Sequence, residues 1–155
     1  MNTNFINYLK SNSLDIKIHN FDEFTHTAQQ AATALGCDVS QIAKSLIFKS
    51  TSGKPILVVA SGSNRVDETK IATLLGESIS KADADFVKEK TGYTIGGVPP
   101  FAFLNPIITF IDEDLQKFAT IWAAAGTNNS VFSITPNNLI KLSSGQVANI
   151  KQSTV

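Results

Sequence analysis

The feature that most constrains the fold is a pair of short apolar runs with a glycine-containing turn between them. Residues 46–48 and 56–60 carry only apolar side chains, and Ser52, Gly53 and Lys54 lie between the two runs. Runs of this length bounded by turn residues predict buried strands, and the short connection predicts a β-hairpin. An antiparallel hairpin disfavours a doubly wound sheet, whose strands are parallel and joined by helices.

Further helices and strands are expected on both sides of this hairpin. Helical spacing of apolar residues predicts a helix around residues 5–9, and alternation predicts a strand over residues 14–18. Four more helices are each predicted to begin at a capping side chain: Thr27, Asp67, Asp83 and Thr135. Three of these helices are followed by a glycine suited to a left-handed end: Gly36, Gly76 and Gly92. Four more strands are expected at residues 107–111, 120–124, 131–134 and 147–150.

The predicted strands outnumber the long helices. This balance, with the hairpin, favours an α+β fold with a mixed, barrel-like sheet. The sequence contains no internal repeat, no low-complexity segment and no stretch that resembles a linker. We therefore expect residues 1–155 to form a single domain.

The balance of charges argues against several classes of partner. Thirteen Lys and Arg residues match thirteen Asp and Glu residues, so no strong field attracts DNA or an anionic membrane. Arg65 is the only arginine, whereas an extended phosphate-binding face usually has several. The single cysteine, Cys37, cannot form an internal disulfide, and neither a signal peptide nor a membrane-spanning run is visible. We expect a soluble cytoplasmic protein without a membrane or DNA partner.

Several familiar catalytic arrangements are missing from the sequence. His19, His26 and Cys37 lack the close spacing of metal ligands, and no glycine-rich nucleotide-binding motif occurs. Residues 61–63, Ser-Gly-Ser, lack the flanking glycines of a nucleophile elbow. The acidic residues 112–114 are predicted to begin a helix, where carboxylates complement the helix dipole, rather than to hold a metal. We therefore expect neither a metal nor a cofactor.

Two features point to a binding site, and the first is Lys44. It lies where a short helical turn meets the first strand of the hairpin, with Ile and Leu on both sides. An ammonium held among apolar side chains is partly desolvated, so that its pKa falls or it binds an anion tightly. The alternative is a lysine whose ammonium reaches solvent beside the strand.

The second feature is the loop of residues 93–101, in which Gly96 and Gly97 precede Pro99 and Pro100. Glycines let the main chain approach a ligand with its N–H groups directed inward, and prolines keep the loop rigid. Such a loop can hold a carbonyl group or a ribose with main-chain donors alone. The alternative is a corner between strands that requires a positive φ at one glycine.

Together, the two features resemble the YbaK/prolyl-tRNA synthetase editing-domain family. The resemblance rests on Lys44 at a helix-to-strand junction and on the Gly96 to Pro100 loop further along the chain. It also rests on the order of further blocks, which are residues 61–67, 81–87, 118–126 and the Thr135-Pro136 helix start. The match extends from residue 25 to the final predicted strand.

The resemblance implies both a fold and an activity. The family fold is a mixed, barrel-like sheet surrounded by helices, in agreement with the α+β prediction. Its members are hydrolases, aminoacyl-tRNA deacylases that cleave the ester of mischarged tRNA, mostly proline tRNA carrying a small amino acid other than proline. A chain of this length is similar to the free-standing members, which act in trans. The implied partners are the acylated 3′ end of the tRNA and prolyl-tRNA synthetase.

The resemblance also implies the residues of the site. Lys44, Gly96 and Gly97 match catalytic positions, with a ribose hydroxyl of the substrate and a water molecule in place of a side-chain nucleophile. The matched substrate-binding positions are Thr25, Thr27, Val98, Pro100, Ala124, Ala125 and Gly126. Thr25 and Thr27 are expected to set the size of the acyl pocket, although Thr27 also fits the role of a plain helix cap.

Two departures from the family pattern leave the amino acid substrate open. Members that remove cysteine carry Ser-Gly-Gly where this chain has Ala at 124 and 125 and Gly at 126, and the alanine-removing branch carries asparagine where Ser45 stands. A non-catalytic module that uses the same pocket to bind an aminoacyl group or a nucleotide is the alternative to an enzyme.

Overall fold

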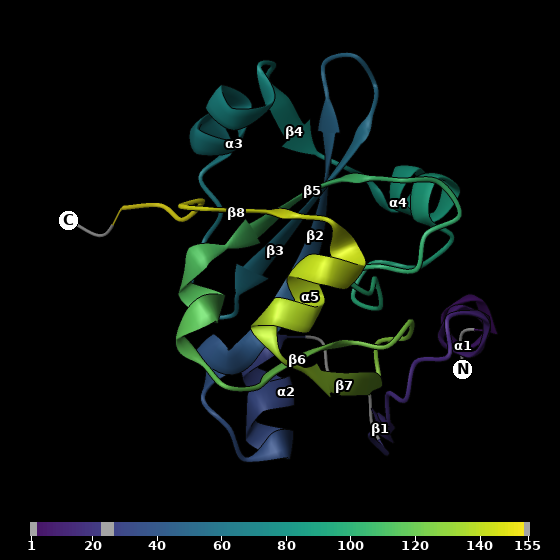
Figure 1. Cartoon of the computed structure of the whole chain (residues 1–155). Helices are drawn as coiled ribbons and strands as arrows, with labels where there is room; N and C mark the ends of the chain where they lie inside the picture. The colour runs from purple at the N-terminus through teal and green to yellow at the C-terminus, as the bar shows by residue number, and fades with distance from the viewer. Residues whose placement is uncertain (1–2, 23–26, 154–155) are drawn as a thin grey trace.

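The computed structural model describes residues 3–22 and 27–153 (Figure 1). The helices are α1 (Thr3–Ser11), α2 (Ala28–Leu35), α3 (Glu68–Leu75), α4 (Ala84–Thr91) and α5 (Pro136–Ser143), with two 3-10 helices, η1 (Val39–Gln41) and η2 (Glu113–Lys117). The strands are β1 (Ile18–Asn20), β2 (Ile42–Ser50), β3 (Pro55–Ser61), β4 (Ile79–Lys81), β5 (Ile108–Asp112), β6 (Ile121–Ala124), β7 (Ser130–Ile134) and β8 (Gln146–Ala148). None of the helices in this described part has the length and apolar character that crossing a membrane requires.

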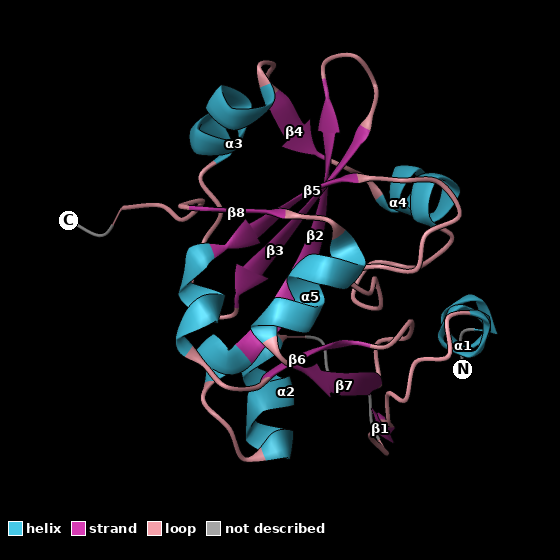
Figure 2. Ribbon diagram, viewed as in Figure 1, coloured by secondary structure: helices cyan, strands magenta, loops and turns pink. Residues whose placement is uncertain are grey.

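The eight strands form one mixed sheet. Their order is β1-β7-β6-β2-β3-β5-β8, with β4 attached to β2. β2 pairs antiparallel with β3 and β4 but parallel with β6, and β3 pairs parallel with β5. The predicted α+β class is therefore confirmed, and helices lie around the sheet (Figure 2). The sheet does not close into a barrel, because β1 and β8, at the two ends of the order, do not pair with each other within the described residues.

Local sequence signals account for most element boundaries. The predicted hairpin of β2 and β3 is present, and the N–H of Ser50 donates to the carbonyl of Lys54 across its turn at 2.9 Å. The predicted helix caps each accept a main-chain hydrogen bond: Thr27, Asp67, Asp83 and Thr135. Glycines with positive φ end three of these helices, as predicted.

A few boundaries differ from the prediction. The strand expected over residues 14–18 lies further along the chain: β1 begins at Ile18, the last residue of the expected strand, because β7 pairs with residues 18–20. Leu14 and Ile16 instead pack against the main core without joining the sheet. β8 is shorter than expected, although Ile150 beyond it is fully buried. The acidic residues 112–114 do begin a helix, but a 3-10 helix.

The paired strands β2 and β3 are apolar on both faces, so the sheet separates two hydrophobic clusters. Ala43 and Ile47 belong to the larger cluster, which α1 and α5 cover, whereas Phe48 and Ala60 belong to the smaller one. This is the alternation expected of strand side chains. Consecutive residues of β2 therefore point to opposite faces, which determines where Lys44 lies.

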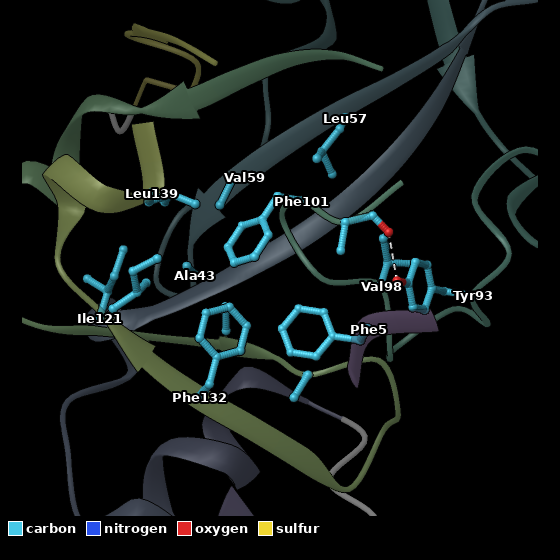
Figure 3. Close-up of a cluster of buried hydrophobic side chains, with 14 of the residues drawn as sticks. Phe5, Ala43, Leu57, Val59, Tyr93, Val98, Phe101, Ile121, Phe132 and Leu139 are labelled. Atoms are coloured by element: carbon cyan, nitrogen blue, oxygen red, sulfur yellow. Dashed lines mark hydrogen bonds between the residues drawn. The ribbon is translucent and has the colours of Figure 1, made fainter. Parts of the chain in front are cut away.

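The larger cluster fixes the segment that follows the glycine-proline loop. The ring centroid of Phe101 lies 5.8 Å from that of Phe5 and 5.6 Å from that of Phe132 (Figure 3). The hydroxyl of Tyr93 donates to the carbonyl of Ala102 at 2.8 Å, which joins the two ends of the loop. Burial raises the pKa of Tyr93 to about 12, so this hydroxyl remains a donor at neutral pH. The core thus anchors both ends of the loop.

Candidate functional site

A cavity of about 960 Å³ lies beside a gap in the pairing of β2. On this edge β2 pairs with β6 only at Ile42 and Ala43, and with β4 only from Phe48 to Ser50. No described strand lies beside residues 44–47, which are between the two pairings. The cavity is lined from β2, from the glycine-proline loop, from β6 and from the turn between β6 and β7.

Lys44 lines this cavity from the third position of β2. Its Nζ donates to the main-chain carbonyl of Asn64 at 2.6 Å, and the side chain is half-buried. Burial lowers the pKa of Lys44 from its ordinary value, and repulsion by Arg65 lowers it further, while Asp112 acts in the opposite direction. The geometry therefore favours the first interpretation of this lysine, a partly desolvated ammonium, over a freely solvated one.

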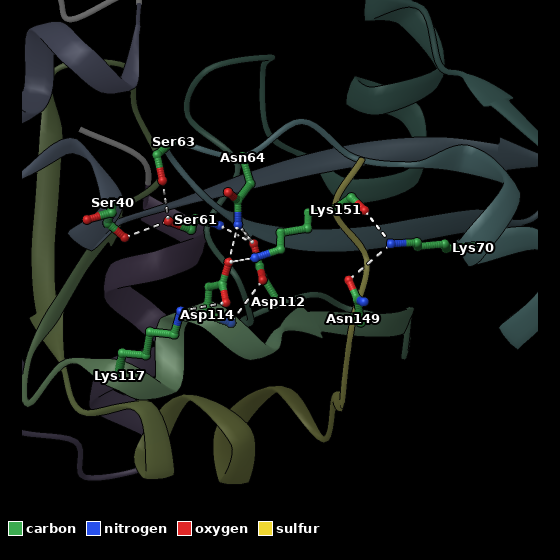
Figure 4. Close-up of polar contacts among 10 residues, drawn as sticks. All are labelled: Ser40, Ser61, Ser63, Asn64, Lys70, Asp112, Asp114, Lys117, Asn149 and Lys151. Carbon is green, nitrogen blue, oxygen red and sulfur yellow. Dashed lines mark hydrogen bonds and ion pairs between the residues drawn. The ribbon is translucent and has the colours of Figure 1, made fainter. Parts of the chain in front are cut away.

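The carbonyl that holds Lys44 is itself fixed by a polar network. The side-chain amide of Asn64 donates to Asp112 and to Asp114, at 2.8 Å in each case (Figure 4). Asp112 is fully buried and also accepts the N–H of Ser61 at 3.0 Å. Because both amide hydrogens of Asn64 are engaged, its main chain has little freedom to move.

Asp114 joins this network to two lysine side chains nearer the surface. The ammonium of Lys151 lies 2.7 Å from one carboxylate oxygen of Asp114, and that of Lys117 lies 3.1 Å from the other. Hydrogen bonds, from Lys151 first and then from Asn64, hold the pKa of Asp114 well below its usual range. The carboxylate is therefore charged at neutral pH, as its role as an acceptor requires.

The glycine-proline loop reaches the same cavity with part of its main chain. Gly96 and Val98 line the cavity, whereas Pro100 lines a separate hollow on the surface. Gly96 has a φ of +89°, and the N–H of Gly97 donates to the carbonyl of Thr94 at 2.9 Å. The N–H of Gly97 is thus used inside the turn and does not serve as a free donor for a ligand.

Gly97 also allows the loop to pack closely against a neighbouring turn. A Cβ atom at this buried residue would lie 2.8 Å from the Cα of Thr127, closer than real contacts of this kind. The glycine therefore lets the loop pack directly against the turn between β6 and β7. Two residues of that turn, Thr127 and Asn128, line the cavity beside Gly96.

Of the remaining predicted residues, some line the cavity and others lie behind its wall. Ala124 and Thr27 line the cavity, and Thr27 also forms a complete capping box with Gln30, which confirms its helix-cap role; its role in setting the size of the acyl pocket stays a prediction. Ala125 is buried and donates its N–H to Ser130, and Gly126 has a φ of +99°; neither lines the cavity. Thr25, like His26, lies outside the described residues.

Two polar side chains near this region are poor nucleophiles. The hydroxyl of Ser61 is fully buried and donates to the carbonyl of Ser40 at 2.7 Å. Burial raises the pKa of the Cys37 thiol, and Asp38 raises it further. Within the described ranges, no three His, Cys, Asp or Glu side chains gather in the way that a metal site needs. The cavity can instead offer an ammonium, a guanidinium and main-chain groups.

Sequence reasoning missed most of the network behind Lys44. Asn64 and Arg65 lie in residues 61–67, one of the blocks that carry the family resemblance. Asp112 and Asp114 lie in the acidic run that predicts a helix start. Nothing in the sequence indicates that these two segments meet. They meet because β3 and β5 pair in parallel and end side by side.

Comparisons with known proteins show the family to which this chain belongs. The chain matches the model of a family described as the aminoacyl-tRNA editing domain over residues 22–142. YwhH of Bacillus subtilis (strain 168), an uncharacterized protein, is 35% identical over 127 residues, which are 82% of this chain and 81% of that protein. EbsC of Enterococcus faecalis, named as a candidate Cys-tRNA(Pro)/Cys-tRNA(Cys) deacylase, is 24% identical over 96% of this chain and 92% of its own length. A crystal structure of a candidate trans-editing enzyme for prolyl tRNA synthetase has a TM-score of 0.91 and 36% identity, and covers 99% of both chains.

Proposed function

Because this chain belongs to the aminoacyl-tRNA editing domain family, we propose that it is a deacylase that acts in trans on mischarged proline tRNA. The ester it hydrolyses would carry a small amino acid other than proline. One observation carries the proposal: a half-buried ammonium, bound only to a carbonyl among the described contacts, shares a cavity with a glycine-rich main-chain loop. The names of EbsC and of the structural neighbour point to the same substrate class.

The proposed reaction is simple hydrolysis of the aminoacyl ester. Water adds to the carbonyl carbon, the bond from that carbon to the ribose oxygen breaks, and the products are the free amino acid and uncharged tRNA. The neighbouring ribose hydroxyl of the substrate orients the water. The protein binds and orients these groups and stabilises the negative charge that develops on the carbonyl oxygen.

Lys44 is proposed to bind the anionic part of the terminal nucleotide. Its ammonium has three N–H donors, and the carbonyl of Asn64 takes one of them. The other two are available to a phosphodiester oxygen, and Arg65 lines the same cavity as a second cation. The main-chain groups at Gly96 and Val98 are then left to contact the ribose or the acyl group.

Selection of small amino acids would follow from the shape of the cavity. Val98, Ala124 and Thr27 line it, and pockets of this kind distinguish substrates that differ by one methylene by about 1–3 kcal/mol. A deacylase of aminoacyl-tRNA would act in the cytoplasm, with prolyl-tRNA synthetase as a partner. An alternative function is non-catalytic binding in the same cavity.

Deacylation of charged proline tRNA tests the proposal directly. The tRNA is charged separately with alanine, cysteine, serine, 2-aminobutyrate and proline, and incubated with the protein or with its Lys44→Ala variant. We expect release of at least one non-prolyl residue that depends on Lys44, with prolyl-tRNA spared. Binding of these tRNAs without release would contradict the enzyme and support the non-catalytic module.

A further inference from the structure

The edge of β2 that faces the cavity is open over a short and well-defined stretch. Pairing with β6 ends at Ala43, and pairing with β4 begins at Phe48. Figure 1 shows β4 and β6 near opposite ends of β2. Lys44, Ser45 and Ile47 all line the cavity at this opening. The opening therefore exposes main chain to a ligand in the middle of a sheet.

The direction of the main-chain groups along β2 follows from two hydrogen bonds on the β3 side. The N–H of Gly62 donates to the carbonyl of Ile42 at 2.7 Å, and the N–H of Ser50 donates to the carbonyl of Lys54 at 2.9 Å. Main-chain groups alternate between the two edges of a strand, so the even-numbered residues of β2 face β3. The N–H and C=O of Ser45 consequently face the open edge.

The side chain of Ser45 is a second indication that a ligand supplies hydrogen bonds at this position. Its Oγ is buried and has no hydrogen-bond partner among the described residues. Buried polar atoms are nearly always paired, because an unpaired one costs free energy. Ser45 thus brings three polar groups to one place: an N–H, a C=O and a hydroxyl.

The chemistry of an aminoacyl ester matches the two main-chain groups of Ser45. The α-ammonium and the carbonyl oxygen of such an ester are attached like the N–H and C=O of one residue in an extended chain. In the hydrogen-bonded pair of an antiparallel ladder, two residues exchange both of their main-chain hydrogen bonds. One aminoacyl group is therefore enough to complete such a pair, as a peptide does when it adds to a sheet edge.

We propose that the open edge at Ser45 binds the aminoacyl group in the way that it would pair with one residue of an antiparallel strand. The N–H of Ser45 donates to the ester carbonyl oxygen, and its C=O accepts a hydrogen bond from the α-ammonium. This inference rests on the proposed function and names the part of the cavity that recognises the acyl group. It assigns to the Ser45 N–H the donor role that Gly97 does not fill.

The first test uses stable analogues in which an amide replaces the ester. The first probe is 3′-amino-3′-deoxyadenosine acylated on its 3′ nitrogen with alanine. The second carries lactic acid at the same nitrogen and so has a hydroxyl in place of the α-ammonium. Calorimetry measures the Kd of each for the unmodified protein. We expect the alanyl analogue to bind at least about tenfold more tightly, because its charged donor is replaced by a neutral hydroxyl in the lactyl analogue.

The second test removes the donor from the chain. Serine at position 45 is replaced by its α-hydroxy analogue, so that a main-chain ester oxygen stands where the N–H was. We expect both probes to bind about tenfold more weakly and any deacylation to slow by a similar factor. The matched control is the same replacement at Lys49, whose N–H faces β4; it should lower thermal stability without changing either Kd.

Two results would overturn the inference: equal affinity for the two probes, or unchanged affinity after loss of the Ser45 N–H. Failure of the proposed function looks different. In that case no charged tRNA is hydrolysed by the unmodified protein, while the difference between the alanyl and lactyl probes persists and still supports the site at Ser45.

Discussion

The ammonium nitrogen of Lys44 and the carbonyl oxygen of Asn64 lie 2.6 Å apart, although twenty residues separate them in the chain. The hydrogen bond fixes one N–H of the ammonium and leaves two directed elsewhere. Because Asn64 is held by two carboxylates, the position of Lys44 depends on the end of β5 as well as on β2. Several measurable consequences follow from this dependence.

Replacing Lys44 with alanine should reduce kcat/KM for deacylation by roughly 100-fold or more, because the cation that binds the phosphodiester and so positions the terminal nucleotide is lost. Thermal stability should change little, since the side chain is only half-buried. Single-turnover deacylation and a melting curve measure the two effects. Lys49→Ala is the matched control, an exposed lysine on the same strand, and should retain full activity. Full activity of Lys44→Ala would exclude the proposed role.

Asn64→Ala should lower kcat/KM by about tenfold, because the carbonyl that holds Lys44 is no longer fixed by Asp112 and Asp114. Lys117→Ala is the control: it removes an exposed partner of Asp114 without touching Asn64. Both variants are assayed at a temperature well below their melting points, so that loss of folded protein does not contribute. Equal kinetics for the two variants would mean that the network stabilises the fold only.

The pH dependence of activity should report the ammonium of Lys44. Burial and Arg65 lower its pKa, so the charged form should be lost, and kcat/KM should fall, at a pH below 10.5. Arg65→Ala removes the repulsion and should move this fall to higher pH. The rates are corrected for uncatalysed ester hydrolysis at each pH. A fall that moves to lower pH in Arg65→Ala would contradict this assignment.

Stability in acid should depend on the pair of Lys151 and Asp114. The pKa of Asp114 in the folded state is depressed, so its contribution is present above the unfolded value of about 3.9 and disappears as the pH falls through the folded value. Lys151→Met should therefore lower the melting temperature at pH 7 by at most a few degrees. The difference from the unmodified protein should shrink below pH 4. Lys141→Met, on an exposed lysine of α5, should show no such trend.

The two loop glycines should respond differently to alanine. At Gly97 the new Cβ would lie 2.8 Å from Thr127, and we expect a loss of about 1–3 kcal/mol together with reduced turnover. At Gly96 the nearest atom would be 3.6 Å away, so the cost is the strain of a positive φ, about 1–2 kcal/mol. Urea unfolding gives the order of the two losses. A larger loss at Gly96 would contradict the packing described for Gly97.

Local structure was predictable because its signals lie within a few residues. The capping side chain of Thr135, the glycine that ends α2 and the turn after β2 each specify their own element. The mixed sheet followed from the hairpin and the number of strands. Closure of the sheet was not predictable, because it depends on whether the first and last strands meet.

The site could be predicted only in part, and largely through the resemblance. Lys44, Gly96 and Ala124 do share a cavity, but no local pattern indicates that they meet. At Gly97 the structure shows two features that the sequence does not indicate: the residue leaves space for Thr127, and its N–H is already bonded inside the turn. Contacts between segments distant in sequence decide such details.

The gap beside β2 also bears on which molecules can pair with the edge of this strand. Unpaired strand edges are templates for pairing with other molecules, and proteins commonly protect them with charges, prolines or very short strands. Here the open stretch covers four residues, or about 13 Å of strand, and β6 and β4 occupy the same edge on either side. A strand of the usual length of about five to six residues is too long to lie in this interval. The neighbouring strands thus limit the length of chain that can pair with this edge while leaving room for a single residue.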